Sequence, residues 1–252
     1  MDHQQPQKND AVLGGQGLMP NSIVLGGLEG VKQRLSSAVV EHRIASLSEA
    51  VVYGNRGITL VIRALRDPVI EVQQAAYSLL KQRPEPIAQR AVEQYYVQTH
   101  YGHLEQLLAA GNWKAADQES RIVLLQACGI DPFAVPSPAA AHIADCPCRD
   151  LQIVDRFWRR YSKGRFGFSV QQSIWQPLDQ LYWDKAEVWM QFGDRVGWRG
   201  GKLFGDRYWK RYPELTFSLH APVGHLPFLG DAFGIFTVEL ISDRLTFCQT
   251  NA

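Results

Sequence analysis

Between about residues 25 and 98, one sequence pattern recurs after 30 residues. The matched pairs are Leu35 and Leu65, Val39 and Val69, Glu41 and Glu71, and Ala45 and Ala75. In the second copy, Asp67-Pro68 forms a turn signal before an apolar stripe at helical spacing, which consists of Val69, Val72, Ala76, Leu79 and Leu80. An internal repeat of this length is typical of helix pairs that bury their apolar faces against the next pair. The pattern therefore predicts helical repeats over this region.

This repeat resembles the short HEAT-like repeat of cyanobacterial phycobilin lyase-type proteins. Residues 23–98 are then a HEAT-like helical domain or, because about three repeats are usually needed for an independent solenoid, a small helical bundle. A bilin lyase-type enzyme is a functional alternative that rests on the repeat alone, since no convincing nucleophile accompanies it. Residues 1–22 are rich in Gln, Asn and Gly and lack periodicity, so we expect a disordered tail.

Aromatic residues are distributed unevenly along the chain. Of the 27 Phe, Tyr and Trp residues, only Tyr53 and Tyr77 precede residue 90. This change predicts a boundary near residues 97–103 and a second domain over residues 103–243. Apolar spacing and helix-ending glycines predict its helices over residues 103–110, 113–128, 149–161, 169–175 and 186–192, with Gly193 ending the last. With a loop over 131–147 and an irregular region over 199–227, the chain is predicted to be all-α.

The segment Gly164 to Gln171 connects two of these predicted helices. Gly164 lies where a helix often ends, and Ser169 can cap the helix that follows. We expect Phe166 and Phe168 to be anchored in the core. The segment is therefore expected to be a structural signature that supports neighbouring loops.

Charge and hydropathy exclude several classes of protein. The chain has 26 basic and 25 acidic residues and a net charge of +1, which gives no general attraction to nucleic acid. It has no apolar run of about 18 residues, and its start lacks the pattern of a signal peptide. We therefore expect a soluble, cytoplasmic protein with reduced thiols, whose cysteines are Cys128, Cys146, Cys148 and Cys248.

Candidate catalytic and metal-binding groups are poorly supported. The His142, Cys146 and Cys148 group lacks the spacing of a zinc site, so we expect no metal. Ser169 does not lie in a nucleophile elbow, and His225 in its Gly/Pro turn more often serves a backbone hydrogen bond than proton transfer. The sequence thus predicts a protein that is not an enzyme.

The strongest candidate for binding is the segment Gly205 to Pro213, in which aromatic and basic residues alternate without a period that would bury them. It lies in a region where 16 of 61 residues, from Phe157 to Phe217, are aromatic. Aromatic faces beside cations suit a planar apolar ring that carries carboxylates. They also suit stacked nucleobases, but the neutral net charge argues against nucleic acid.

Several motifs resemble the genomes-uncoupled-four family, in order and in spacing, from about Leu104 to about Ile241. They comprise Ala110-Gly111-Asn112-Trp113-Lys114-Ala115-Ala116-Asp117-Gln118-Glu119, Asp150-Leu151, Val154-Asp155, Trp158, Tyr161-Ser162-Lys163-Gly164-Arg165-Phe166-Gly167-Phe168-Ser169-Val170-Gln171, Trp175, Gly197-Trp198, and Ala221-Pro222 with Gly224-His225-Leu226-Pro227. The resemblance implies an all-helical domain that binds protoporphyrin or magnesium protoporphyrin, has no prosthetic group, and stimulates magnesium chelatase through its porphyrin-binding large subunit. It implies a location in the cyanobacterial cytosol or the plastid stroma, and a peripheral association with the thylakoid or envelope membrane is compatible with it.

The resemblance also implies a cupped surface between residues 131–147 and 205–217. Its candidate porphyrin-binding residues are Ile143, Trp209, Tyr212, Leu215, Phe217, Phe233, Arg207, Lys210 and Arg211. Two departures stand out: Pro138-Ala139-Ala140-Ala141 where relatives present an aromatic residue, and Phe233 and Phe236 where relatives carry arginines. The alternative function is therefore an interaction adaptor that has lost the ligand.

Overall fold

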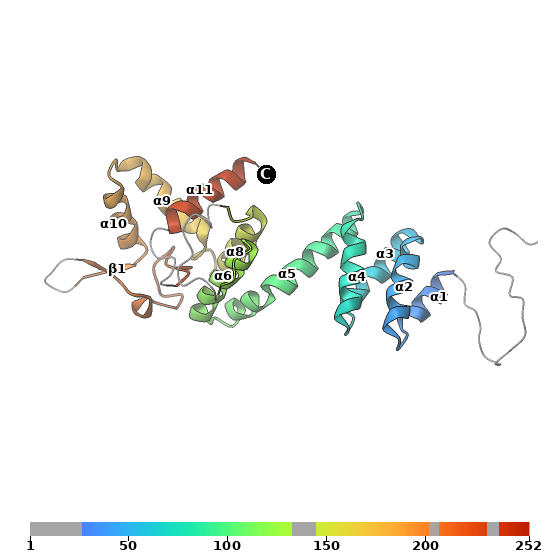
Figure 1. Ribbon diagram of the computed structural model, residues 1–252. Coiled ribbons are helices and arrows are strands. Elements are labelled where there is room, and N and C mark those ends of the chain that lie inside the picture. Colours follow the sequence, from blue (N-terminus) through green and yellow to red (C-terminus); the bar gives the residue numbers. More distant parts are fainter. Residues whose placement is uncertain (1–26, 133–144, 202–206, 231–236, 252) are drawn as a thin grey trace, which may run out of the picture. The chain divides into compact units, whose positions relative to one another are not determined.

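The computed structural model describes residues 27–132, 145–201, 207–230 and 237–251, and these form an all-α protein (Figure 1). The chain divides into two compact units, residues 1–92 and 93–252. Within the described ranges, no helix is both long enough and apolar enough to cross a membrane.

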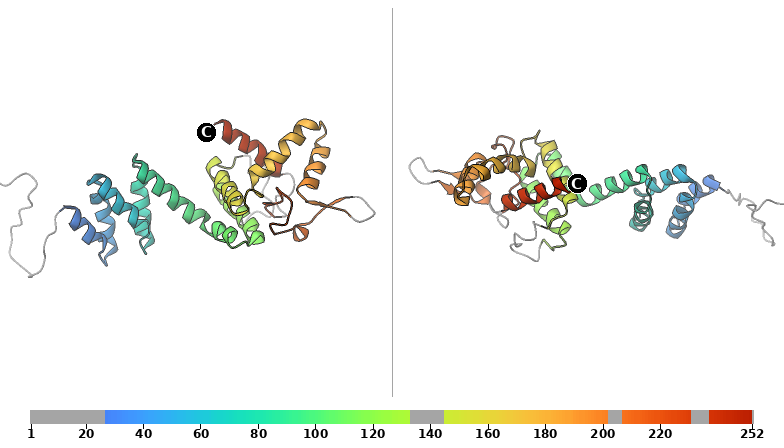
Figure 2. Two further views of the ribbon diagram at one scale, coloured as in Figure 1. Left: turned by 180° about the vertical axis from the view of Figure 1, so that it is seen from behind. Right: turned by 90° about the horizontal axis from the view of Figure 1, so that it is seen from above.

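The N-terminal unit is built from stacked helices (Figure 2). These are α1 (Gly27–Leu35), α2 (Val40–Val51), α3 (Gly54–Ala64), α4 (Ile70–Lys81) and the beginning of α5 (Pro86–Ala109). Helices α2 and α4 begin 30 residues apart, as the repeated pattern predicts. Their buried faces carry Leu47 and Ala50 in α2, and Val72, Ala76 and Leu80 in α4.

The turns before α2 and α4 are constructed in the same way. The Ser37 hydroxyl accepts the Val39 amide at 3.1 Å, and the Asp67 carboxylate accepts the Val69 amide at 2.9 Å. Arg43 joins the two turns, because its guanidinium donates to the Ser37 carbonyl at 2.7 Å and pairs with Asp67 at 3.1 Å. Since both partners of this ion pair are nearly buried, it couples the two repeats.

The C-terminal unit contains the rest of α5 and the later elements. These are α6 (Trp113–Ala127), α8 (Cys148–Tyr161), α9 (Phe168–Leu181), α10 (Lys185–Arg195), β1 (Arg199–Gly200), β2 (Tyr208–Trp209), the 3-10 helix η1 (Tyr212–Glu214) and α11 (Thr237–Thr250). The predicted helices over 113–128 and 149–161 are confirmed as α6 and α8. Helix α11 lies beside α9, as all views show.

Three helix boundaries differ from the expected ones. Residues 103–110 do not form a separate helix but end α5, because nothing between residues 97 and 103 interrupts the helical backbone. Helix α9 continues past Pro177 to Leu181, although Pro177 lies inside the helix and cannot donate a hydrogen bond to the preceding turn. Leu178, directly after the proline, is buried in the core, and this packing favours the continued helix. Helix α10 runs through Gly193, which is buried, to Arg195.

The turn between α8 and α9 confirms the core role of its two phenylalanines, since Phe166 and Phe168 are buried. The prediction that Ser169 caps α9 is wrong. The first turn of α9 is instead bonded by Asp155 of α8, whose carboxylate accepts the Ser169 amide at 2.8 Å and the Ser169 hydroxyl. Gly167 permits this approach: its φ is +137°, and a Cβ there would lie 2.8 Å from an Asp155 carboxylate oxygen.

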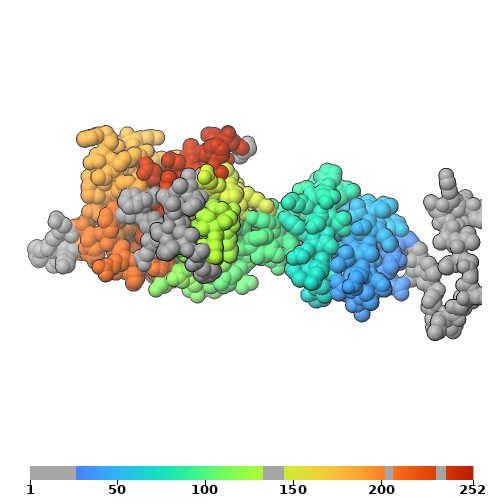
Figure 3. Space-filling model, viewed as in Figure 1, coloured from blue at the N-terminus to red at the C-terminus, as the bar shows by residue number. Residues whose placement is uncertain are grey.

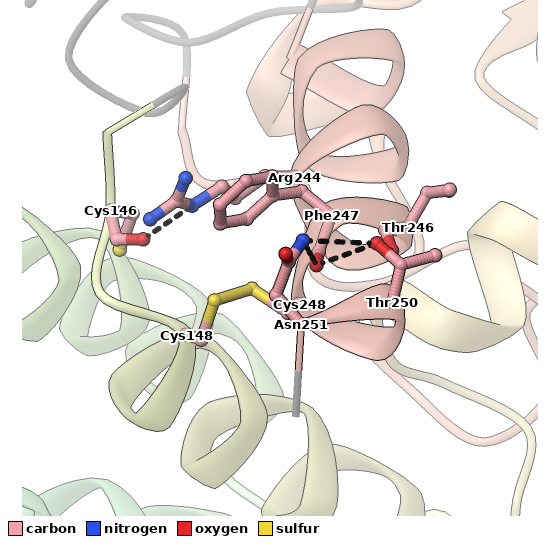
Figure 4. Close-up of a disulfide and its surroundings, with 8 residues drawn as sticks. All are labelled: Cys146, Cys148, Arg244, Thr246, Phe247, Cys248, Thr250 and Asn251. Atoms are coloured by element: carbon pink, nitrogen blue, oxygen red, sulfur yellow. Dashed lines mark hydrogen bonds between the residues drawn. A yellow bond between two sulfur atoms is a disulfide. The ribbon is translucent and has the colours of Figure 1, made fainter.

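The expectation of reduced thiols is corrected by a disulfide between Cys148 and Cys248 (Figure 4). The two cysteines are 100 residues apart, and their Cα atoms lie 5.5 Å from each other. Packing of α11 in the C-terminal unit brings Cys248 to the start of α8. Cys128 and Cys146 are free.

Candidate ligand-binding site

The candidate site begins at a short hairpin after α10. Strands β1 and β2 pair antiparallel, with Arg199 opposite Trp209 and Gly200 opposite Tyr208. The Lys210 amide extends the pairing by donating to the Trp198 carbonyl at 2.8 Å. The hairpin therefore fixes the start of the aromatic and basic segment, which lies on the surface of the C-terminal unit (Figure 3, deep orange).

Trp209 packs directly against the end of α10. A Cβ atom on Gly193 would lie 2.4 Å from the Trp209 ring, so only glycine admits the indole here. This contact explains why α10 carries a glycine without ending at it. The Arg199 guanidinium covers the ring at 5.7 Å from its centroid, so Trp209 is half-buried between α10 and β1.

The cations of the segment are engaged by the protein to different degrees. Arg207 pairs with Asp194 at 2.7 Å, and Arg199 reaches the same carboxylate at 3.2 Å. The Lys210 ammonium donates to the Gly197 carbonyl at 2.9 Å. Arg211 is exposed, and its backbone amide donates to the Glu214 carboxylate at 2.7 Å. Arg211 is thus a cation that a ligand can approach from solvent.

Next to this hairpin lies a surface recess of about 530 Å³. Its lining residues are Tyr208, Trp209, Arg211, Pro213 and Glu214. Its volume falls within the range of small-molecule sites, about 300 to 1,000 Å³. Two aromatic rings and a proline can receive a flat apolar molecule, and Arg211 can pair with an acidic edge of that molecule, while the Glu214 carboxylate accepts the Arg211 amide.

Other predicted residues serve the core beneath the recess. Tyr212 and Leu215 are buried, and the Tyr212 ring meets Phe217 edge-on, with 5.1 Å between centroids. Phe217 is half-buried, and the Lys114 ammonium of α6 lies 5.7 Å from its ring centroid. Tyr212, Leu215 and Phe217 therefore hold the segment in place, with part of Phe217 left accessible.

A buried carboxylate secures the next part of the chain. Asp117 of α6 accepts the amides of Leu229 at 3.0 Å and Gly230 at 3.1 Å, and also the Phe228 amide. The Tyr212 hydroxyl is a further hydrogen-bond partner of this carboxylate. Burial nevertheless raises the pKa of Asp117 to about 6, against the opposing effect of its donors. Asp117 thus links α6, the aromatic segment and residues 228–230.

His225 has a structural role, as expected, although its partners lie on other segments. Its Nδ1 contacts the Val196 carbonyl at 2.6 Å, and its Nε2 accepts the Thr216 amide at 3.0 Å. The ring is therefore neutral, with its proton on Nδ1. Burial lowers the pKa of His225.

Two predicted site residues, Ile143 and Phe233, lie outside the described residues. The same is true of both departures from the family pattern and of the metal candidate His142. Across the described ranges, no three His, Cys, Asp or Glu side chains are grouped so that they could hold a metal ion.

Three residues of this region are not among the predicted site residues, although Tyr208 belongs to the predicted aromatic and basic segment. Tyr208 lines the recess and is 44% exposed, Lys114 faces the aromatic core, and Asp194 neutralises two arginines. Tyr208 could have been found from its position between two predicted residues. Lys114 and Asp194 reach the site only through the packing of α6 and α10, which no local sequence signal reveals.

The fold and the recess define an all-helical protein with an aromatic, cation-edged surface. Residues 94–243 match the GUN4-like family, and the chain belongs to this family.

Several known proteins are similar to this chain. The "Uncharacterized protein ycf53" of Porphyra purpurea is 33% identical over 139 residues, covering 55% of this chain and 53% of that protein. The "Ycf53-like protein" of Synechocystis is 27% identical over 210 residues, covering 78% and 84%. The "Tetrapyrrole-binding protein, chloroplastic" of Arabidopsis thaliana is 31% identical over 158 residues, covering 61% and 57%. The chain spans only about half the length of the Porphyra relative.

Among solved structures, ligand-free Arabidopsis thaliana GUN4 is similar with 25% identity and a TM-score of 0.47. The match covers 58% of this chain and 94% of that one.

Proposed function

We propose that this chain binds a tetrapyrrole in the recess beside the β1–β2 hairpin. The observation that carries the proposal is the combination of Tyr208, Trp209 and Arg211 around one recess. Membership of the GUN4-like family and the name of the Arabidopsis relative support a tetrapyrrole as the flat ligand. Burying about 200 Å² of macrocycle at roughly 25 cal/mol per Å² contributes about 5 kcal/mol before ordering costs.

The finer function follows from the family resemblance. We propose protoporphyrin or magnesium protoporphyrin as the ligand, held reversibly by a protein that catalyses no reaction itself. The proposed partner is the porphyrin-binding large subunit of magnesium chelatase, and the proposed location is the cyanobacterial cytosol or plastid stroma. Residues 103–243 are the proposed ligand domain and residues 23–98 a HEAT-like helical domain.

Titration with deuteroporphyrin, followed by quenching of tryptophan fluorescence, tests the ligand. Tyr208→Ala and Arg211→Ala alter exposed positions of the recess, and we expect each to raise Kd about 5- to 10-fold. Trp183→Ala is the matched control, since Trp183 is 97% exposed and precedes α10, whereas the recess lies beyond the other end of that helix. Absence of saturable quenching, or equal Kd values for all four proteins, would refute the proposed site.

A second candidate is the ligand-independent adaptor. Two side chains that are predicted to bind the ligand are already paired within the protein, and this favours the adaptor. Arg207 pairs with Asp194, and the Lys210 ammonium donates to the Gly197 carbonyl. If the chain is an adaptor, a pull-down with the chelatase large subunit should recover the same amount of it with and without deuteroporphyrin. Recovery only with porphyrin excludes it.

A further inference from the structure

The four cysteines of the chain gather at one place in the C-terminal unit. Cys148 and Cys248 form the disulfide, Cys146 lies two residues before Cys148, and the thiols of Cys128 and Cys146 are hydrogen-bonded to each other. The pair Cys128 and Cys146 is free, whereas its neighbours are oxidised. Figure 4 shows Cys146 beside the disulfide, so a dithiol and a disulfide occupy the same region of the unit.

The disulfide joins two helix ends. Cys148 is the first residue of α8, and Cys248 lies in the last turn of α11. One turn earlier in α11, the Arg244 side chain donates to the Cys146 carbonyl at 2.8 Å. The end of α11 is thus held to the start of α8 by one covalent and one non-covalent connection.

Helix α11 has its own packing against α9, which does not involve the disulfide. Gln172 of α9 donates to the Ser242 carbonyl at 2.9 Å and to the Thr246 hydroxyl at 3.1 Å. Ile241 and Leu245 are buried in the core of the unit. Opening the disulfide therefore leaves α11 packed up to Thr246 and frees only its last turn, residues 247–250.

The two sulfur-bearing residues differ in accessibility. Cys248 is 2% exposed, whereas Cys148 is half-buried at the surface end of α8. A thiolate on Cys148 is also favoured by the N-terminal end of that helix, which stabilises negative charge. Cys148 is therefore the residue that an external thiol reaches, and its sulfur is a good leaving group in the second step.

We propose that the Cys148–Cys248 bond is a reversible modification site, which a dithiol reductant opens in the folded protein to release the last turn of α11. One thiolate of the reductant attacks the Cys148 sulfur and forms a mixed disulfide, and Cys248 leaves as a thiolate. The second thiol of the reductant then attacks its own bonded sulfur and releases Cys148. Two electrons pass to the protein, each cysteine sulfur takes up one proton, and the reductant ends as a disulfide. This inference does not depend on the proposed ligand.

The test uses the full-length protein in native buffer, with dithiothreitol as the probe. Thiols are counted by maleimide labelling and mass spectrometry after denaturation in acid, before and after treatment. We expect two labelled cysteines before treatment and four after it. The midpoint of thermal unfolding should fall by about 10 °C on reduction, because a bond that closes a long loop strongly restricts the unfolded chain. Hydrogen exchange should accelerate in residues 247–250 while α8 and α9 stay protected.

Two double variants separate this effect from others. Cys128→Ser with Cys146→Ser keeps the disulfide, and we expect the same downward shift on reduction. Cys148→Ser with Cys248→Ser should fold with the lower Tm and be insensitive to dithiothreitol. Four labelled thiols in the untreated protein would overturn the proposal. So would a disulfide that is reduced only after denaturation, or a shift that persists in the variant without Cys148 and Cys248.

Discussion

The indole of Trp209 lies against Gly193 so closely that a single methyl group on the glycine would fall 2.4 Å from the ring. This contact connects the last turn of α10 to strand β2. It therefore sets the position of the wall of the recess, which Trp209 shares with Tyr208. The position of the recess thus depends on the absence of a side chain in a neighbouring helix.

Gly193→Ala should displace Trp209 and destabilise the protein by about 1 to 3 kcal/mol, the cost of overpacking a close contact. The free energy of unfolding from urea titration measures this. The controls are Trp209→Ala alone and the double variant Trp209→Ala with Gly193→Ala. Once the indole is removed, the alanine at position 193 should lower the free energy of unfolding only slightly. Additive effects of the two substitutions would contradict the contact.

The Asp194 carboxylate is expected to limit the contribution of Arg207 to ligand binding. Asp194→Asn should strengthen binding of deuteroporphyrin about 2- to 5-fold at low salt, because it frees an arginine whose exposed ion pair is worth only about 0.2 to 1 kcal/mol. Arg207→Gln is the matched control and should weaken binding slightly or leave it unchanged. Porphyrin titration at two salt concentrations gives the measurement, and a weaker affinity for Asp194→Asn would contradict the expectation.

The sequence reveals those parts of the fold that depend on local periodicity. The 30-residue repeat predicts α2 and α4, and the stripe of Leu151, Val154 and Trp158 predicts α8. Prediction from the sequence fails where a residue far along the chain determines the local structure. Gly193 resembles a helix end until Trp209 packs on it, and Ser169 resembles a cap until Asp155 takes that role.

The candidate site follows the same division. Trp209 and Arg211 could be predicted from the alternation of aromatic and basic residues, and both line the recess. The burial of Tyr212 and the pairing of Arg207 could not, because Lys114, Asp117 and Asp194 come from other helices. The pairing of Cys148 with Cys248 was hidden for the same reason, since α11 brings them together across 100 residues.

Asp117→Asn should destabilise the protein at pH 7 by about 1 to 3 kcal/mol. The amide group turns one acceptor into a donor that faces the amides of residues 228–230, so a buried donor is left without an acceptor. Urea unfolding measures the loss, and Gln118→Ala, at the exposed neighbouring position of α6, is the control. A loss no larger than that of the control would contradict the role of Asp117.

The same residue predicts a pH dependence. Because burial raises the pKa of Asp117 to about 6, above its ordinary 3.8, the native state holds a proton between these pH values that the unfolded state releases. The stability from this group is therefore fully present below about pH 4 and is lost as the pH rises to about 6, by up to about 3 kcal/mol. The difference in unfolding free energy between wild type and Asp117→Asn should shrink over that interval. A constant difference from pH 4 to 7 would show that the carboxyl keeps its ordinary pKa.

His225 predicts the opposite slope. Burial lowers its pKa, and the Lys210 ammonium acts in the same direction, so the folded protein keeps the ring neutral where the unfolded chain accepts a proton. Stability from His225 is thus present above about pH 6.5 and is lost as the pH falls below it, at no more than about 1.4 kcal/mol per pH unit. His225→Gln keeps one donor and one acceptor but cannot titrate. Its free energy of unfolding should therefore fall furthest below that of the wild type at pH 7 to 8, and less far below it at pH 5. Lys210→Met should raise the pKa of His225, which NMR titration of the ring measures. If His225→Gln lowers the free energy of unfolding by the same amount at pH 5 and at pH 7 to 8, a buried neutral histidine is contradicted.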